Sequence, residues 1–126
     1  MKIEVSNGEI LDKCSILKIK LERINDESKL VNIQKEYDIL SPIVWDIISD
    51  DEELSNQWNL LCQVNEKLWE IEDDIRDKER KGEFDQRFID LARYVYITND
   101  ERSEIKREIN ILSKSDLVEE KSYEKY

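Results

Sequence analysis

Polar and charged side chains occur in two segments of this chain where an apolar stripe should face a helical core. Placed at about 100° per residue on helices, residues 51–81 and 85–113 carry amide, hydroxyl and charged groups within their apolar stripes. These groups belong to Asn65, Glu72, Thr98, Asn99, Arg102 and Lys106. A buried charge needs a partner, because removing it from water alone carries a large free-energy penalty. The pattern therefore predicts either an internal network of ion pairs or a binding site.

Charged residues also occupy one arc of the first expected helix, about 9–25. The arc mixes these charges with Ile16 and Ile19, which predicts that it is partly buried. Its charged members are Glu9, Asp12, Lys13, Lys20 and Arg23. The plainly solvated strip of this helix is expected to consist of Ser15, Lys18 and Glu22. The cations of the arc could pair with carboxylates in the region of Glu72.

Two interpretations of these polar groups stay open at this point. In the first, a satisfied network fixes the register of the helices. Its members would be Glu9, Asp12, Asn65, Glu72, Asn99 and Lys106. In the second, a polar cavity among the helices binds an anionic small molecule, with Glu72 or Glu9 as an acid or orienting group. The donors of that anion site would be Lys13, Lys20, Arg23 and Arg102. Neither interpretation assigns a catalytic residue.

Several kinds of catalytic and metal site are excluded by residue type. The chain has no His, which removes the commonest general base and the commonest zinc ligand. No P-loop, Gly-rich fingerprint or nucleophile elbow occurs. The acidic run of residues 70–74 is typical of a solvated helix face, since a carboxylate metal site needs inward ligands from several helices. We therefore expect no metal and no cofactor, and whether the protein is an enzyme stays open.

The charge balance and the apolar segments limit the partners of the protein. The 126 residues include 31 acidic and 20 basic residues, a net charge of −11, which disfavours nucleic acid because phosphates repel an acidic surface. No stretch approaches the ~18 apolar residues of a membrane span, and no secretory signal is recognisable. Cys14 and Cys62 lie in helical apolar patterns, typical of core thiols in a reducing compartment. We expect a cytoplasmic protein without membrane insertion.

Long helices with short connections are predicted, because Gly8, Pro42 and Gly82 are the only Gly and Pro residues. A Ser-x-x-Glu capping box precedes the first helix, a Ser-Pro pair is typical of a helix start, and Gly82 is expected to cap a helix end. The expected helices are about 9–25, 27–40, 42–48, 51–81 and 85–113. Residues 115–126 are expected to form a short helix or a C-terminal arm.

The two longest helices must form an antiparallel hairpin, because only about three residues connect them. Opposed positions then sum to roughly 166, so Asn65 lies beside Arg102 and Glu72 faces a position near residue 94. The predicted fold is an all-α antiparallel helical bundle built on this long hairpin, with a shorter N-terminal helical pair. Residues 1–126 are expected to form a single helical domain.

Self-association is also predicted. Trp45, Trp58 and Trp69, together with the apolar seams of 9–25 and 42–48, offer more apolar surface than two long helices can cover. We therefore expect a homo-oligomer, with a dimer as the simplest form. A protein partner or an anionic small molecule is the other kind of partner that the sequence allows.

Four blocks of the sequence resemble a small bacterial all-helical family of unknown function. They are EILDKCSILKIKLERI (9–24), VNEKLWEIEDDIRDKER (64–80), FIDLARYVYITNDERSEIKREIN (88–110) and LVEEKSYEKY (117–126). The blocks cover most of the chain. The family positions in this sequence are Glu9, Asp12, Lys13, Lys20, Arg23, Asn65, Glu66, Trp69, Glu70, Asn99, Asp100, Arg102, Lys106 and Tyr123. Lys114 stands where the resemblance leads us to expect Gly.

The resemblance implies an accessory role and carries no reaction with it. Relatives often lie near surface-polysaccharide and glycosyltransferase genes, which implies a cytoplasmic interaction protein linked to surface-polysaccharide biosynthesis. The residues themselves allow an alternative, a small helical enzyme or binding protein for an anionic metabolite. Such a protein would use a pocket inside the bundle lined by Lys, Arg and Glu side chains.

Overall fold

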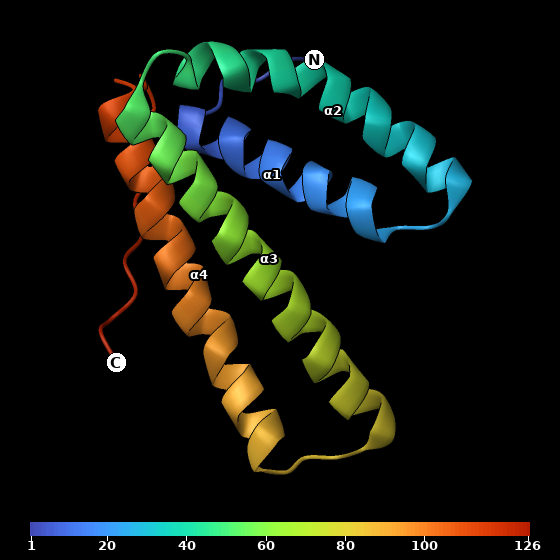
Figure 1. The fold of residues 1–126 in the computed structure, drawn as a ribbon. Coiled ribbons are helices and arrows are strands. Elements are labelled where there is room, and N and C mark those ends of the chain that lie inside the picture. Colours follow the sequence, from blue (N-terminus) through green and yellow to red (C-terminus); the bar gives the residue numbers. More distant parts are fainter.

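The computed structural model describes residues 1–126 as four α-helices without a strand. The helices are α1 (Asn7–Arg23), α2 (Glu27–Ile48), α3 (Glu52–Lys81) and α4 (Gln86–Leu112). α3 and α4 form a long antiparallel hairpin, and the shorter α1–α2 pair crosses one half of it (Figure 1). This arrangement confirms the predicted all-α bundle built on a helical hairpin. None of the four helices combines the length and the apolarity needed to cross a membrane.

The helix boundaries follow from side chains that satisfy the free backbone N–H groups of the first turns. Ser6, Asp51 and Asp85 each accept a hydrogen bond from the backbone N–H three residues later, over 3.0–3.1 Å. Gly82 ends α3 in the left-handed conformation with a φ of 65°, as expected for a C-terminal cap. Asp26 caps α2 in the same way, by accepting from the N–H groups of Ser28 and Lys29. The local chemistry of the sequence therefore sets where all four helices begin.

The structure corrects one predicted boundary. The sequence predicts a break before Pro42, but α2 continues through this residue. Proline lacks the N–H that would donate to the carbonyl of Asp38, which weakens the helix locally. Tyr37 lies before the proline and Val44 lies after it, and both pack against the same hydrophobic core. This packing holds the two halves of α2 together as one helix.

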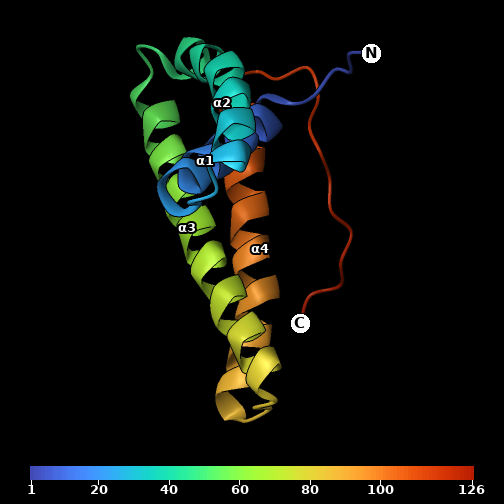
Figure 2. The same cartoon turned by 90° about the vertical axis from the view of Figure 1, so that its right-hand side faces the viewer.

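The hydrophobic core lies where α1 and α2 cross the hairpin. It consists of Leu11, Cys14, Val44, Ile48, Leu54, Trp58, Leu61, Val64 and Ile109. Each large aliphatic side chain buried here contributes roughly 1.5–3 kcal/mol, which makes the crossing the most stable part of the molecule. Away from this core, residues 68–97 of the hairpin bury only Ile71 and Leu91. The far end of the hairpin extends beyond α1 and α2 (Figures 1 and 2).

Residues 115–126, which we call the C-terminal arm, form no helix or strand. The chain reverses after α4 and the arm runs back beside this helix (Figure 2). Ion pairs join the two segments, among them Glu120 with Arg107 and Lys121 with Asp100. The rings of Tyr126 and Tyr96 meet edge to face with their centroids 5.3 Å apart.

Candidate functional site

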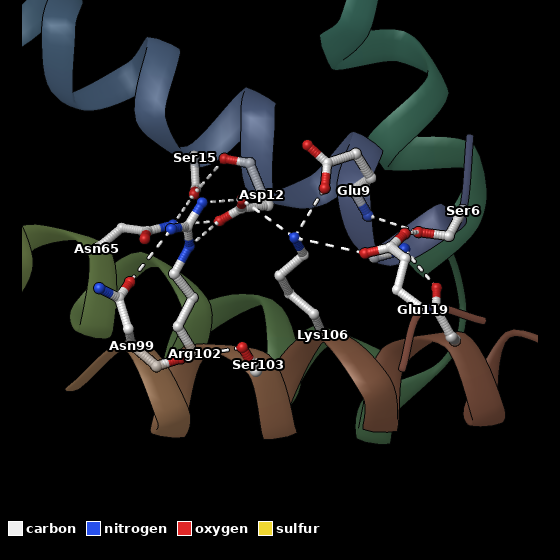
Figure 3. Close-up of polar contacts among 12 residues, drawn as sticks. Ser6, Glu9, Asp12, Ser15, Asn65, Asn99, Arg102, Ser103, Lys106 and Glu119 are labelled. Atoms are coloured by element: carbon white, nitrogen blue, oxygen red, sulfur yellow. Dashed lines mark hydrogen bonds and ion pairs between the residues drawn. The ribbon is translucent and has the colours of Figure 1, made fainter. Parts of the chain in front are cut away.

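The carboxylate of Asp12 lies at the centre of a polar cluster where α1 crosses the hairpin (Figure 3). Its side chain is only 1% exposed. Asn65 Nδ2 of α3 and Arg102 Nε of α4 each donate to Asp12 Oδ1 over 2.9 Å. The other oxygen accepts from Arg102 Nη2 and lies 3.5 Å from Lys106 Nζ. Three helices therefore meet at one buried and fully paired carboxylate.

Ser15 and Asn99 extend this cluster at its edge. The Ser15 hydroxyl accepts from Asn65 Nδ2 over 2.6 Å and donates to the backbone carbonyl of Asp12 over 2.8 Å. Asn99 Oδ1 accepts from Arg102 Nη1 over 3.4 Å. Ser15 is completely buried, so the prediction that it belongs to a solvated strip is wrong. α1 packs against α2, α3 and α4 together, which covers this side of the helix.

Lys106 joins the cluster to the N-terminal end of α1. Its Nζ atom lies 2.7 Å from Glu9 Oε2 and 3.6 Å from Glu119 Oε2 of the C-terminal arm. The hydroxyl of Ser6, the N-cap of α1, donates to the other oxygen of Glu119 (Figure 3). The three carboxylates of Glu9, Asp12 and Glu119 surround this ammonium group, so its positive charge is compensated inside the molecule.

The pKa values of the cluster follow from these contacts. Burial alone would raise the pKa of Asp12, but the hydrogen bonds from Arg102 and Asn65 and the charges of Arg102 and Lys106 lower it below its ordinary value. Burial alone would lower the pKa of Lys106, but its hydrogen bond to Glu9 and the nearby carboxylates raise it. Both groups stay charged near neutral pH, unlike a general acid or base, whose pKa lies near the working pH.

Gly8 and Asn110 form a second junction between α1 and α4. The Gly8 N–H donates to Asn110 Oδ1 over 2.7 Å, and Asn110 is 1% exposed. A Cβ atom on Gly8 would lie 2.6 Å from the carbonyl oxygen of Lys106, closer than real contacts allow. The sequence pattern indicated no role for Asn110, and it placed Gly8 only within a capping box. A glycine in the first turn of a helix permits another backbone to approach closely, and this was the sequence signal for the contact at Gly8.

The structure does not bring the four predicted anion donors together. Lys13 pairs with Glu36 of α2 over 3.7 Å. Arg23 lies 3.7 Å from Glu66 and 3.2 Å from Glu70 of α3. Lys20 is half-buried on α1 and makes no ion pair within the Asp12 cluster. Of the predicted donors, Arg102 alone belongs to the cluster.

A groove of about 440 Å³ lies beside the cluster, where α1 passes over α3 and α4. Its lining residues are Ile16, Asn65, Leu68, Trp69, Glu72, Asp73, Arg76, Asn99 and Arg102. The predicted network members Asn65, Glu72 and Asn99 thus share one groove with Arg102. Glu72 itself pairs with Arg76 on its own helix over 3.3 Å. The expected pairing of this region with a cation of α1 occurs instead at Glu66 and Glu70, which lie 3.7 and 3.2 Å from Arg23.

The charges and ring of this groove determine what it could bind. Two guanidinium groups and two carboxylates line it, so its charge is balanced, and Trp69 offers an aromatic surface. No group of three or more Cys, Asp or Glu side chains is placed to hold a metal ion. The arrangement is therefore suited to hydrogen bonding and stacking with a polar ligand rather than to chemistry at a metal.

A family model matches residues 1–126, the whole length of the chain. The chain belongs to a family of unknown function (DUF6165). This result confirms the resemblance to a family of unknown function that the four sequence blocks indicated. The chain matches no curated protein and no solved structure. Any function of this DUF6165 member must therefore be inferred from its own geometry.

Proposed function

We propose that this protein is a cytoplasmic accessory protein that acts by binding other protein chains, the first of which is a second copy of itself. The observation that carries the proposal is a face of the hairpin that α1 and α2 leave uncovered (Figures 1 and 2). The family resemblance supports placing this role in surface-polysaccharide biosynthesis.

One side of the hairpin is covered by α1 near the crossing. The uncovered face is the part of the same side that lies beyond α1. Ile109, Arg102, Val95 and Phe88 are seven residues apart, so they lie along one side of α4. Ile109 is buried in the core and Arg102 contacts α1, whereas Val95 and Phe88 lie beyond the crossing and are half-buried. A partner that lies on this stripe would bury apolar surface that the hairpin cannot cover by itself.

The charges of α3 support a second copy as that partner. Residues 66–74 carry five acidic and one basic side chain, whereas residues 76–81 carry four basic and two acidic ones. If two α3 helices pack antiparallel about a two-fold axis, the acidic half of each faces the basic half of the other. The present pairs within the helix, such as Glu72 with Arg76, are exposed and weak, so they can exchange partners.

The Asp12 cluster supports binding rather than a reaction. Its carboxylate accepts hydrogen bonds from Asn65 and Arg102 and its pKa is lowered, so it is not poised to take up a proton near neutral pH. Lys106 is likewise held by carboxylates and its pKa is raised. These groups stabilise the crossing of α1 over the hairpin, which in turn sets where the uncovered face begins.

The dimer is tested by sedimentation of two matched variants. Val95→Glu places a charge on the uncovered face, and Val31→Glu places the same charge on α2, where the side chain is 68% exposed. We expect the unaltered protein and Val31→Glu to sediment as dimers and Val95→Glu to sediment as a monomer, with all three equally helical by circular dichroism. A monomer for the unaltered protein at high micromolar concentration contradicts the proposed self-association.

The proposed role in surface-polysaccharide biosynthesis needs a separate test in cells. Deleting the gene should lower the amount of surface polysaccharide, and a copy encoding Val31→Glu should restore it. A copy encoding Val95→Glu should fail to restore it, because the proposed role depends on the uncovered face. An unchanged amount of polysaccharide after deletion contradicts this role but leaves the dimer to be judged by sedimentation.

A second candidate function is binding of an anionic metabolite in the groove beside Asp12. The observation that favours it is the presence of Arg102 and Arg76 in one groove of about 440 Å³, a usual size for a ligand site. Phosphate, a nucleotide sugar or a dicarboxylate should then raise the melting temperature saturably, because each would bind the folded state. Arg76→Met should remove the effect and Arg80→Met should keep it. No saturable shift with any of these anions leaves the accessory role as the better conclusion.

A further inference from the structure

We propose that the C-terminal arm is an intramolecular ligand of a carboxylate-binding site at the junction of α1 and α4. An acidic peptide segment of a partner protein binds this site when the arm leaves it. The inference rests on the proposed accessory function, because it names the kind of protein segment that such a protein would bind.

The site is built from side chains that hold two consecutive carboxylates of the arm. Glu119 lies between the Ser6 hydroxyl and Lys106 Nζ, and Glu120 pairs with Arg107 (Figure 3 shows the Glu119 contacts). Ser6 is 1% exposed and the Lys106 side chain 15% exposed, so the groups that receive Glu119 are held in place by the fold. The N-terminus of α1 adds its positive dipole end to the attraction for a carboxylate.

The arm is attached mainly by ion pairs, and its ring contact, between Tyr126 and Tyr96, lies at the exposed surface. Residues 116–126 are all exposed, including the apolar side chains of Leu117 and Val118. Two cavities of about 430 and 220 Å³ lie between the arm and α4, and Tyr123 and Tyr126 are the only hydrophobic residues that line them. Exposed ion pairs each contribute about 0–1 kcal/mol and weaken with salt. The arm can therefore leave the site at a small free-energy cost.

The turn before the arm also favours its release. Lys114 has a φ of 53°, a left-handed conformation that glycine adopts more readily. Backbone hydrogen bonds from Lys114 to Ile111 and from Ser115 to Asn110 hold this turn at the end of α4. When the arm extends away from α4, Lys114 can relax to an ordinary conformation.

An acidic segment fits this site better than any other kind of peptide. The groups that the arm leaves behind would be Lys106, Arg107 and the Ser6 hydroxyl, all of which can donate to a carboxylate. The rest of the chain carries a net charge that repels acidic partners, so binding would be confined to this junction. The cavities beneath the arm leave room for a segment bulkier than the arm itself.

The test uses the full-length protein and a synthetic peptide with the sequence of residues 115–126. In the variant Glu119→Gln/Glu120→Gln the arm loses the two carboxylates that the site binds, so the site is freed while the rest of the chain is unchanged. We expect this peptide to cause saturable NMR shifts of the Ser6, Asn7 and Arg107 amides in that variant. The unaltered protein should need at least about tenfold more peptide, because its own arm competes at a high effective concentration.

Matched controls separate this site from general charge attraction. Adding Arg107→Glu to the double variant should abolish the shifts, whereas adding Arg93→Glu, on α4 but away from the arm contacts, should leave them. A peptide with Gln at both Glu positions should not bind. No saturable shift in the double variant, or equal binding by the double variant and the unaltered protein, overturns the proposal. The sedimentation result with Val95→Glu is independent of the arm, so failure of this proposal is distinct from failure of the accessory function.

Discussion

Arg102 and Asn65 both donate to Asp12, but their loss should have different consequences. Arg102→Leu removes the main counter-charge of a buried carboxylate, which costs about 3–5 kcal/mol of folding stability. Asn65→Leu removes neutral amide hydrogen bonds and should cost about 1–3 kcal/mol, because Arg102 still pairs with the carboxylate. Urea unfolding of the two variants measures this difference. Equal and negligible effects would show that these side chains are not buried together.

The ionisation of Asp12 should appear in the pH dependence of stability. Its pKa is lowered in the folded protein, so its contribution is present above the unfolded pKa of about 3.9 and is lost as pH falls through the lower folded pKa. Asp12→Asn cannot ionise and should lack this contribution. The difference in unfolding free energy between the two proteins should therefore be largest near neutral pH and shrink below about pH 4. A difference that does not change with pH contradicts the lowered pKa.

At the scale of elements, the contact between α1 and α4 depends on Gly8. Gly8→Ala would favour the helix by up to about 1 kcal/mol, but its Cβ atom meets the backbone of Lys106 at 2.6 Å. Overpacking of this kind typically costs about 1–3 kcal/mol, so we expect a lower melting temperature. Gly82→Asn is the control, because nothing lies within 4 Å of that position and Asn tolerates a positive φ. A melting temperature that rises in Gly8→Ala would contradict the close approach.

The stability of the whole molecule should be uneven along the hairpin. The core lies where α1 and α2 cross the hairpin, whereas residues 68–97 bury only Ile71 and Leu91. Hydrogen exchange should therefore be slow at the crossing and faster in the distal part of the hairpin. If a second copy covers that part, its exchange should slow as protein concentration rises, whereas exchange at the crossing should not change. Distal exchange that is independent of concentration would favour a monomer.

Much of the hairpin could be predicted from the sequence, including the meeting of Asn65 with the surroundings of Arg102. Two long helices joined by a short connection have one antiparallel register, so a helical wheel and the loop length were enough. The partner of both residues, Asp12, was among the candidates, but its central place was not predicted. That place depends on the angle at which α1 crosses the hairpin, which side chains of three helices determine together.

The amino-acid sequence by itself determined the helices, their caps and the side chains available for a polar cluster. These features depend on contacts between residues at most a few turns apart, such as Ser6 with Glu9. Only the tertiary structure decided that Lys13 and Arg23 pair away from Arg102, that α2 continues through Pro42, and that the arm places Glu119 against Lys106. Each outcome depends on packing between segments distant in sequence, which local helical periodicity does not encode.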